Sequence, residues 1–240
     1  MIEELTDTWT TPGGNPARFT FRYRPETTDW NSISSILTHD EYDIRGLALE
    51  GWAVDVGSHV GSMAIALALD NPDLRVIAIE PVPDNVRLVR LNVEQNGLAD
   101  RVVVLAGGAG GPEMDTTRVA WNWDDGPGGT NTGHRFIGGS HLALANPSVA
   151  HEEIEVPSWS IHELLWYVKA SRFAFLKIDC EGCEATFLTD PAISQIDRIV
   201  GEYHPPYINP ATLHLLLDAT HVLSIPDETL SLGSFVAVRR

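Results

Sequence analysis

The chain has 240 residues, a formal net charge of -17 and two cysteines. A single α/β domain of this length buries roughly 70–75% of its unfolded surface, so it needs neither disulfides nor metals to fold. The negative charge argues against nucleic acid or an anionic membrane as a partner. The sequence contains no signal-like segment and no run of about 20 apolar residues. We therefore expect a cytoplasmic protein without membrane contact.

The first 50 residues are expected to form an N-terminal portion that covers the entrance of a cofactor site. Residues 1–17 are rich in Thr, Pro and Gly and predict a loosely held arm. Residues 18–24 alternate between polar and apolar side chains, which predicts an exposed antiparallel strand. Residues 29–42 predict a helix, which we expect to lie across the entrance.

From residue 51 onward, predicted strands and helices alternate. Strands are predicted at 52–56, 75–80, 101–105, 173–179 and 198–204, helices at 62–69, 83–96, 160–170, 184–188 and 210–219, and a terminal hairpin at 222–225 and 234–239. Strand–helix alternation with short links predicts right-handed βαβ units on a parallel sheet. We find no internal repeat, and we expect residues 51–240 and the N-terminal portion to form one domain.

Residues 107–150 interrupt this alternation with a glycine-rich segment. A loop of this length within a domain is typically a lid or a substrate-binding insertion. It contains His134, which is a candidate catalytic residue because a loop histidine can clamp a substrate and exclude water. An ordinary solvated loop residue is an equally good interpretation.

The sequence from Asp55 to Gly61 predicts a strand that ends in a glycine turn and opens a helix. Gly57 and Gly61 allow a tight turn and the close approach of a ligand. The free N–H groups of the helix start point toward such a ligand. Glu80 ends the next predicted strand, where its carboxylate can accept both hydroxyls of a ribose. This arrangement favours a nucleoside-containing cofactor over a glycine turn without a ligand.

The glycine spacing discriminates between cofactors. Dinucleotide sites use G-x-G-x-x-G, whose middle glycine admits a pyrophosphate. Here Ser58 and His59 occupy the crowded positions, and the Gly-Lys-Ser/Thr of a P-loop is absent. S-adenosylmethionine needs no pyrophosphate site, and Asp55 is placed to hold its amino group. The turn therefore favours S-adenosylmethionine over NAD.

A second group of polar residues follows a later buried strand, at 179–184. Its carboxylates are expected at the carboxyl edge of the sheet, where ligands bind in open α/β folds. In one interpretation Asp179 or His204 removes a proton from an acceptor hydroxyl. In another, which we do not favour, Asp179, Glu181 or Glu202 holds a divalent cation that acidifies the hydroxyl. In a third, the two glutamates of the segment are merely the first-turn acids of a helix.

Cys180 and Cys183 have the C-x-x-C spacing of redox and zinc sites. A second cysteine pair that would complete a zinc site is absent from the sequence. We therefore expect two free, buried thiols that pack like small apolar groups.

Three segments in this order resemble the FkbM-type family of S-adenosylmethionine-dependent methyltransferases. They are residues 54–61, Ile79-Glu80-Pro81 with two downstream asparagines, and residues 176–184. The resemblance extends over roughly residues 51–204, and the Asp-x-Glu-Gly-x-Glu element is its most specific part. The chain departs from the family pattern at His59 and at both cysteines.

The resemblance implies the α/β class I methyltransferase fold, which is Rossmann-like. Its mostly parallel central sheet has helices on both faces and an antiparallel strand near the C-terminus. It also implies S-adenosylmethionine as the methyl donor and a small-molecule acceptor, most often a hydroxyl of a sugar or secondary metabolite. N- or carboxyl-methylation and a non-catalytic S-adenosylmethionine-binding protein are alternatives.

These observations define a set of predicted site residues. The predicted donor-binding residues are Asp55, Gly57, Ser58, Gly61, Glu80, Pro81, Gly107, Gly108 and Asp179. The predicted catalytic residues are His204, Asp179 and His134. The identity of the acceptor and the oligomeric state are not predicted.

Overall fold

The computed structural model describes residues 2–10, 16–122, 135–137, 152–204, 207–229 and 233–240. Its centre is a seven-stranded sheet in the order β12-β13-β11-β10-β3-β4-β5. The strands are β3 (Gly51–Val56), β4 (Leu74–Glu80), β5 (Val102–Ala106), β10 (Phe175–Ile178), β11 (Arg198–Tyr203), β12 (His221–Ser224) and β13 (Gly233–Arg239). The strands β5, β4, β3, β10 and β11 are parallel, and β13 is antiparallel to both of its neighbours. This confirms the predicted sheet.

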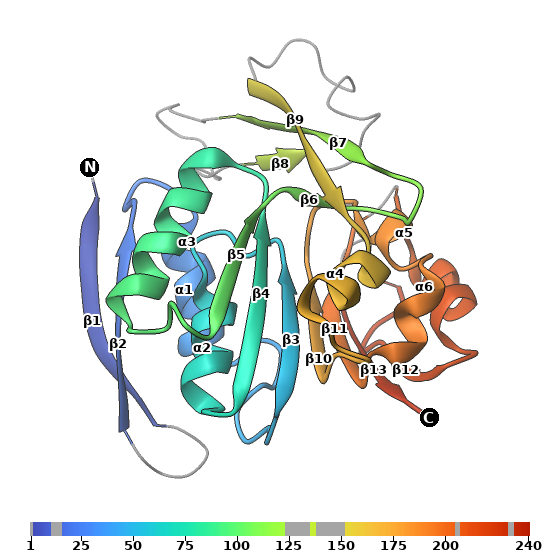
Figure 1. Ribbon diagram of the computed structural model, residues 1–240, viewed down its shortest axis with the longest axis horizontal. Helices are drawn as coiled ribbons and strands as arrows, with labels where there is room; N and C mark the ends of the chain where they lie inside the picture. The colour runs from blue at the N-terminus through green and yellow to red at the C-terminus, as the bar shows by residue number, and fades with distance from the viewer. Residues whose placement is uncertain (1, 11–15, 123–134, 138–151, 205–206, 230–232) are drawn as a thin grey trace.

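Helices cover both faces of this sheet (Figure 1). One group is α1 (Asp29–Leu37), α2 (Ser62–Asp70) and α3 (Pro83–Gln95); the other is α4 (Ile161–Val168), α5 (Glu184–Phe187) and α6 (Pro210–Leu217), with the 3-10 helix η1 (Pro191–Gln195). Successive side chains of a strand point to opposite faces. Ala53 of β3 accordingly packs in the core with α2, whereas Val54 belongs to the core with α4.

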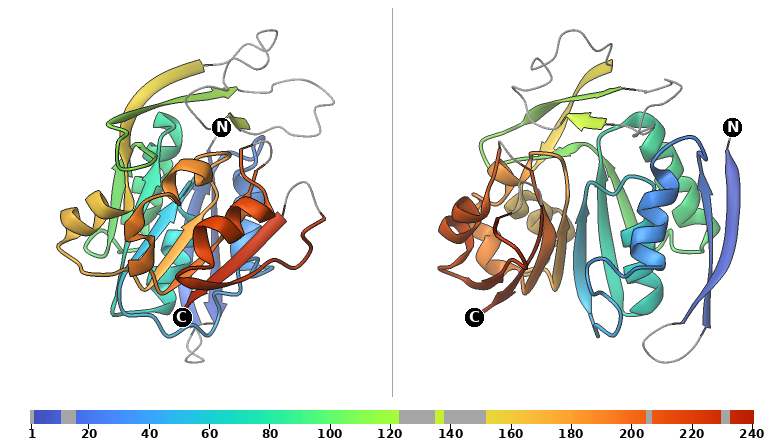
Figure 2. Two further views of the ribbon diagram at one scale, coloured as in Figure 1. Left: turned by 90° about the vertical axis from the view of Figure 1, so that its right-hand side faces the viewer. Right: turned by 180° about the vertical axis from the view of Figure 1, so that it is seen from behind.

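The N-terminal segment is a β-hairpin and not the loosely held arm that its composition predicts. β1 (Glu3–Thr10) pairs with β2 (Pro16–Tyr23) in antiparallel register. The prediction of a strand at 18–24 is confirmed, but Phe21 on it is fully buried. Asn92 of α3 and Asn96, which follows α3, accept hydrogen bonds from the backbone of β2. Figure 2, seen from behind, shows α1 between this hairpin and the central sheet.

The region predicted as a long loop contains strands of a second sheet. These are β6 (Gly108–Ala109), β7 (Thr116–Asn122) and β8 (Arg135–Ile137), and β9 (Glu152–Trp159) completes the order β6-β9-β7-β8. These strands were not predicted because the segment is rich in glycine and because β6 and β7 pair with β9, which lies far along the chain. His134 lies outside the described residues.

The second sheet lies beyond the carboxyl edge of the central sheet, at the top of Figure 1. The parallel strands β3, β4, β10 and β11 end at that edge, so the residues that follow them come together there. In the part of the chain that the structure describes, no helix combines the length and apolar character needed to cross a bilayer.

Candidate active site

The turn after β3 adopts the conformation that its glycines permit. Gly57 and Gly61 have φ values of 75° and 88°, and His59 between them has a φ of 52°. A Cβ atom on Gly57 would clash with the carbonyl oxygen of Asp179 at the end of the neighbouring strand. Glycine at this position therefore lets the ends of β3 and β10 lie against each other, and the two predicted halves of the site become neighbours.

Glu80 holds this turn through hydrogen bonds to the protein itself. Its Oε1 accepts from the backbone N–H of Val82 (3.0 Å) and from Asn85 Nδ2 (3.1 Å), and its Oε2 accepts from the N–H of His59 (2.9 Å). Burial raises the pKa of Glu80, and the neighbouring donors oppose this rise. A carboxylate has about four acceptor positions, so three protein donors leave one for a ligand. Acceptance of a ribose by both oxygens stays a prediction, and it requires one of these donors to be exchanged.

His59 connects the turn to the N-terminal portion of the chain. Its Nε2 lies 3.1 Å from Oδ1 of Asp29, the first residue of α1. Arg24 donates to both oxygens of the same carboxylate, from Nε at 2.9 Å and from Nη2 at 2.8 Å. Burial raises the pKa of Asp29, but the hydrogen bonds from His59 and Arg24 outweigh it, and the net pKa lies well below its usual range.

Lys177 of β10 is a buried cation beneath the turn, and the sequence reasoning gave it no role. Its Nζ donates to the carbonyl of Gly57 at 2.9 Å and lies 3.7 Å from Asp55 Oδ1 and 3.5 Å from Asp179 Oδ2. Burial lowers the pKa of Lys177, but the adjacent carboxylates raise it more. Burial raises the pKa of Asp55, whose Oδ2 accepts from the N–H of Ala64. Its position as a lysine inside an otherwise apolar strand is the sequence feature that could have identified it.

A cavity of about 90 Å³ opens between this turn and Asp179. Its lining residues are Ser32, Ser35, Ile36, Glu41, Tyr42, Gly57, Ser58, Ser62, Met63, Lys177 and Asp179. Ser58 is 3% exposed, and its Oγ has no hydrogen-bond partner among the described residues. A buried hydroxyl without a partner is costly, so this atom fits a polar group of a ligand such as the methionine part of S-adenosylmethionine.

Not every predicted donor-binding residue lines this cavity. Asp55 lies fully buried beneath the turn, where it faces Lys177. Pro81, Gly107 and Gly108 are buried where β4 and β5 end. By contrast, α1 and the segment after it form one wall of the cavity, which is the side where a covering helix was predicted.

The turn after β10 corrects one prediction from the sequence and adds to another. Cys180 and Cys183 form a disulfide and are not free thiols. Glu181 and Gly182 between them have φ values of 58° and 126°, and the tight turn brings the cysteine Cα atoms to 5.5 Å. Glu184 is a first-turn acid of α5, as one interpretation predicts, but it is fully buried: it accepts from the N–H groups of Cys180 (2.9 Å) and Gly182 (2.8 Å).

Glu184 also fixes the orientation of His204, which follows β11. Glu184 Oε1 lies 3.0 Å from His204 Nδ1. Burial lowers the pKa of His204, but the hydrogen bond to Glu184 and the nearby carboxylates raise it to about 9. At neutral pH the imidazole is therefore protonated in this arrangement, and proton removal suits a neighbouring carboxylate better.

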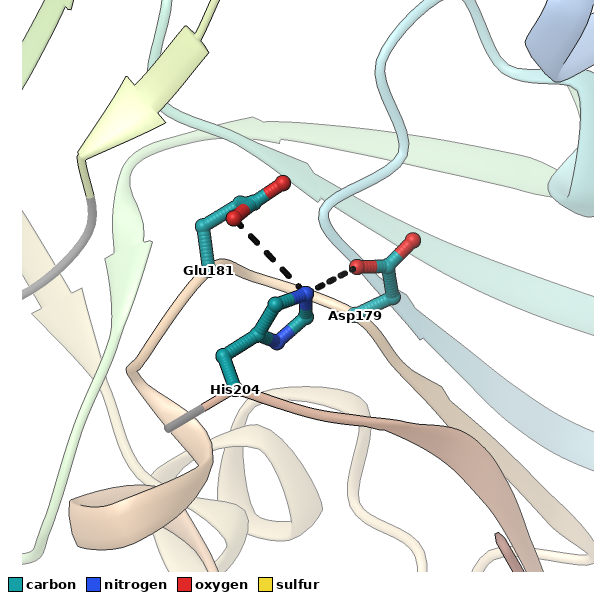
Figure 3. A group of neighbouring side chains, drawn as sticks. All are labelled: Asp179, Glu181 and His204. Atoms are coloured by element: carbon teal, nitrogen blue, oxygen red, sulfur yellow. Dashed lines mark ion pairs between the residues drawn. The ribbon is translucent and has the colours of Figure 1, made fainter. Parts of the chain in front are cut away.

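The other ring nitrogen of His204 faces three carboxylates. Its Nε2 lies 3.7 Å from Asp179 Oδ1, from Glu181 Oε2 and from Glu202 Oε2. Figure 3 shows the side chains of Asp179 and Glu181 directed at this nitrogen. Burial and the charge of Asp179 raise the pKa of Glu202 to about 7. The structure thus brings together the predicted residues Asp179, Glu181, Glu202 and His204.

The strand order and a match to a protein family identify the fold class and the family of this chain. The strand order, with antiparallel β13 inserted beside β11, is that of a class I methyltransferase. The chain belongs to the methyltransferase FkbM domain family, which it matches over residues 55–221, more than half of its length. The family predicted from the three sequence segments is therefore confirmed.

Similar proteins match in sequence over a short segment. The chain is 46% identical over 57 residues to the ribosomal RNA small subunit methyltransferase G of Frankia alni, covering 24% of this chain and 22% of that protein. It is 39% identical over 57 residues to the O-methyltransferase imqG of Aspergillus flavus, covering 24% and 23%. These matches span about a fifth of the length of the curated relatives.

Solved structures match over most of the chain at low identity. The precorrin-6y C5,15-methyltransferase of Geobacter metallireducens has a TM-score of 0.46 and 12% identity, covering 90% of this chain and 92% of that one. An O-methyltransferase of Bacillus cereus in complex with SAH has a TM-score of 0.43 and 16% identity, covering 79% and 74%.

Proposed function

We propose that this protein transfers a methyl group from S-adenosylmethionine to a hydroxyl oxygen of a small molecule, such as a sugar or a secondary metabolite. The observation that carries the proposal is the position of Asp179. Asp179 lines the same cavity as Gly57 and Ser58 of the glycine turn. A donor held by the turn would therefore present its methyl group to the edge of the sheet where the carboxylates gather.

The chain's own residues have separate roles in this reaction. The turn holds the methionine part of the donor, and the buried Ser58 hydroxyl supplies a hydrogen bond. Asp179 orients the acceptor hydroxyl for in-line attack. The acceptor oxygen forms a bond to the methyl carbon, and the bond from that carbon to the donor sulfur breaks. The hydroxyl proton passes to a carboxylate at this edge, Asp179 or Glu202.

The charge of the chain supports a small acceptor. A formal net charge of -17 disfavours approach to a nucleic-acid backbone. The cavity has a volume of only about 90 Å³, and α1 and the buried Tyr42 line it. A small hydroxylated molecule fits both features better than a folded RNA.

The test combines donor binding with product analysis. The full chain is incubated with isotope-labelled S-adenosylmethionine and a panel of acceptors that carry hydroxyl, amine or carboxyl groups, and the methylated atom is identified by NMR. We expect an O-methyl product. Asp179→Asn should lower turnover by about 10²–10⁴-fold, while calorimetry shows that S-adenosylhomocysteine still binds.

Asp197→Asn is the matched control. Asp197 lies just before β11, at the edge of the sheet opposite to the one that carries Asp179, and it pairs with Arg172 on the surface. It should leave turnover unchanged. Methylation of nitrogen or of carboxyl groups alone would refute oxygen as the target. Donor binding without turnover on any acceptor would favour a non-catalytic binding protein.

A further inference from the structure

We propose that Asp179, Glu181 and His204 form a binding site for a divalent first-row metal ion. One ligand atom from each of these residues lies within 4.8 Å of the other two. Asp179 and Glu181 come from the turn after β10, and His204 follows β11, so two neighbouring strand ends hold the group (Figure 3).

The Nε2 atom of the buried residue His204 is the first observation that points to an ion. His204 is 8% exposed, and its Nε2 forms no hydrogen bond with any described residue. The carboxylate oxygens around it lie at 3.7 Å, beyond the 2.7–3.2 Å of a normal hydrogen bond. Two ligands that each lie about 2.1–2.2 Å from one ion are about 3.0–3.6 Å apart at octahedral or tetrahedral angles, close to the 3.7 Å found here. These separations therefore suit ligands around a common centre.

The hydrogen bond on the far side of the ring is the second observation. Glu184 is fully buried, and its carboxylate is fixed by two backbone N–H groups of the turn. A carboxylate only accepts hydrogen bonds, so Nδ1 of His204 carries a hydrogen, and a metal ion would bind at Nε2 in place of the proton that this nitrogen carries without the ion. Metal-binding histidines are held by such a carboxylate in many proteins. Glu184 is thus a positioning residue for the ligand His204.

The ligand set indicates the class of ion. Carboxylates suit Mg²⁺, Ca²⁺ and Mn²⁺, whereas imidazole suits later first-row metals, and Mn²⁺ accepts both. The side chains of Asp179 and Glu181 are 31% and 50% exposed, so the outer side of the site remains open to a further ligand.

The ion would act in the reaction proposed above, and this part of the inference rests on that function. An acceptor hydroxyl that binds the ion through its oxygen becomes more acidic. With Asp179 as a metal ligand, the neighbouring Glu202 is the carboxylate that takes the released proton.

Binding of Mn²⁺ to the metal-stripped full chain tests the site without donor or acceptor. We expect one ion per chain by electron paramagnetic resonance, with nitrogen modulation from one imidazole in the electron spin echo. Glu181→Gln should weaken the affinity by at least about ten-fold, and Glu184→Gln by about 10–100-fold. His204→Gln should also remove the nitrogen modulation. Glu181 is on the surface, so its variant stays informative if the buried variants fail to fold.

His214→Gln is the matched control. His214 also lies between two carboxylates, those of Asp218 and Glu228, but on the surface of α6. It should leave Mn²⁺ affinity unchanged. Absence of saturable binding up to about 1 mM, or equal binding by Glu181→Gln and the unaltered chain, would overturn the proposal.

Calorimetry with S-adenosylhomocysteine separates this proposal from the proposed function. A chain that binds the donor product but no Mn²⁺ refutes the metal site alone. A chain that binds Mn²⁺ but not the donor product supports the metal site and refutes the methyl-transfer function.

Discussion

Two turns at the carboxyl edge of the sheet are each held by a buried glutamate, and they differ in what they leave for a ligand. Glu80 binds the turn after β3 through the N–H group of His59, and it also accepts from the N–H of Val82 and the amide of Asn85, which follow β4. Glu184 binds the turn after β10 through two N–H groups and the ring of His204. The first turn is closed by neutral donors, whereas the second ends in an ionisable side chain that faces carboxylates.

This difference suggests that one turn binds the methyl donor and the other takes part in the reaction. The turn after β3 presents backbone and one hydroxyl to its cavity, which is what a bound donor requires. The turn after β10 presents charged side chains that are partly exposed, which is what proton transfer or metal binding requires. Lys177 contacts both turns, at Gly57 and at Asp179, so a substitution of Lys177 should disturb the structure of both.

Replacement of Lys177 should have the largest effect. Lys177→Met removes the cation between Asp55 and Asp179 and leaves a buried carboxylate without its charge partner. We expect a loss of about 3–5 kcal/mol in the free energy of unfolding, measured by urea denaturation. Lys169 is the other lysine of the chain and is exposed at the end of α4. Lys169→Met should change stability by less than about 0.5 kcal/mol, and equal stability of the two variants would contradict a role for Lys177 between the turns.

A side chain at Gly57 should force the two turns apart. Gly57→Ala combines a positive φ with a clash against the carbonyl of Asp179, and we expect a loss of about 3 kcal/mol in unfolding free energy. Gly97 has a φ of 67° and open space around it. Gly97→Ala should therefore lose only about 1–2 kcal/mol from the backbone conformation. If urea denaturation gave equal losses, the close contact of the two strand ends would be ruled out as the cause.

The matched pair Glu80→Gln and Glu184→Gln distinguishes the turns by function. Each change points an amide N–H₂ at buried donors, so each should lower the unfolding free energy by about 2–3 kcal/mol. Only Glu80→Gln should weaken the binding of S-adenosylhomocysteine in calorimetry, because Glu80 borders the donor side. Only Glu184→Gln should lower turnover at saturating donor. The same change in donor affinity for both variants would show that the turns are not separable.

The sequence predicts the donor turn better than the acceptor turn, for a physical reason. Strand, glycine turn, helix and acid are local features, and each leaves a mark within a few residues, as at Gly57 and Glu80. The contact of His204 with Glu184 joins segments 20 residues apart, and its geometry depends on how β10 and β11 pair. Likewise, the alternation of strands and helices predicted the central sheet, and alternating side chains predicted β2. The pairing of β2 with β1 and its contact with α3 were not predicted, because no local pattern indicates them.

The smallest effect is expected at Asp29, which secures the turn after β3 from the N-terminal side. Because the pKa of Asp29 is lowered in the folded chain, its ionised form stabilises the fold above the unfolded pKa of about 3.9. This stabilisation is lost as the pH falls below that value toward the lowered, folded pKa. Asp29→Asn should therefore be less stable than the unaltered chain by about 2 kcal/mol at pH 7. The difference should shrink steadily below pH of about 4 in urea denaturation. If the two chains differed in stability by the same amount at pH of about 7 and about 3, the charge of Asp29 would not be what stabilises its contacts with His59 and Arg24.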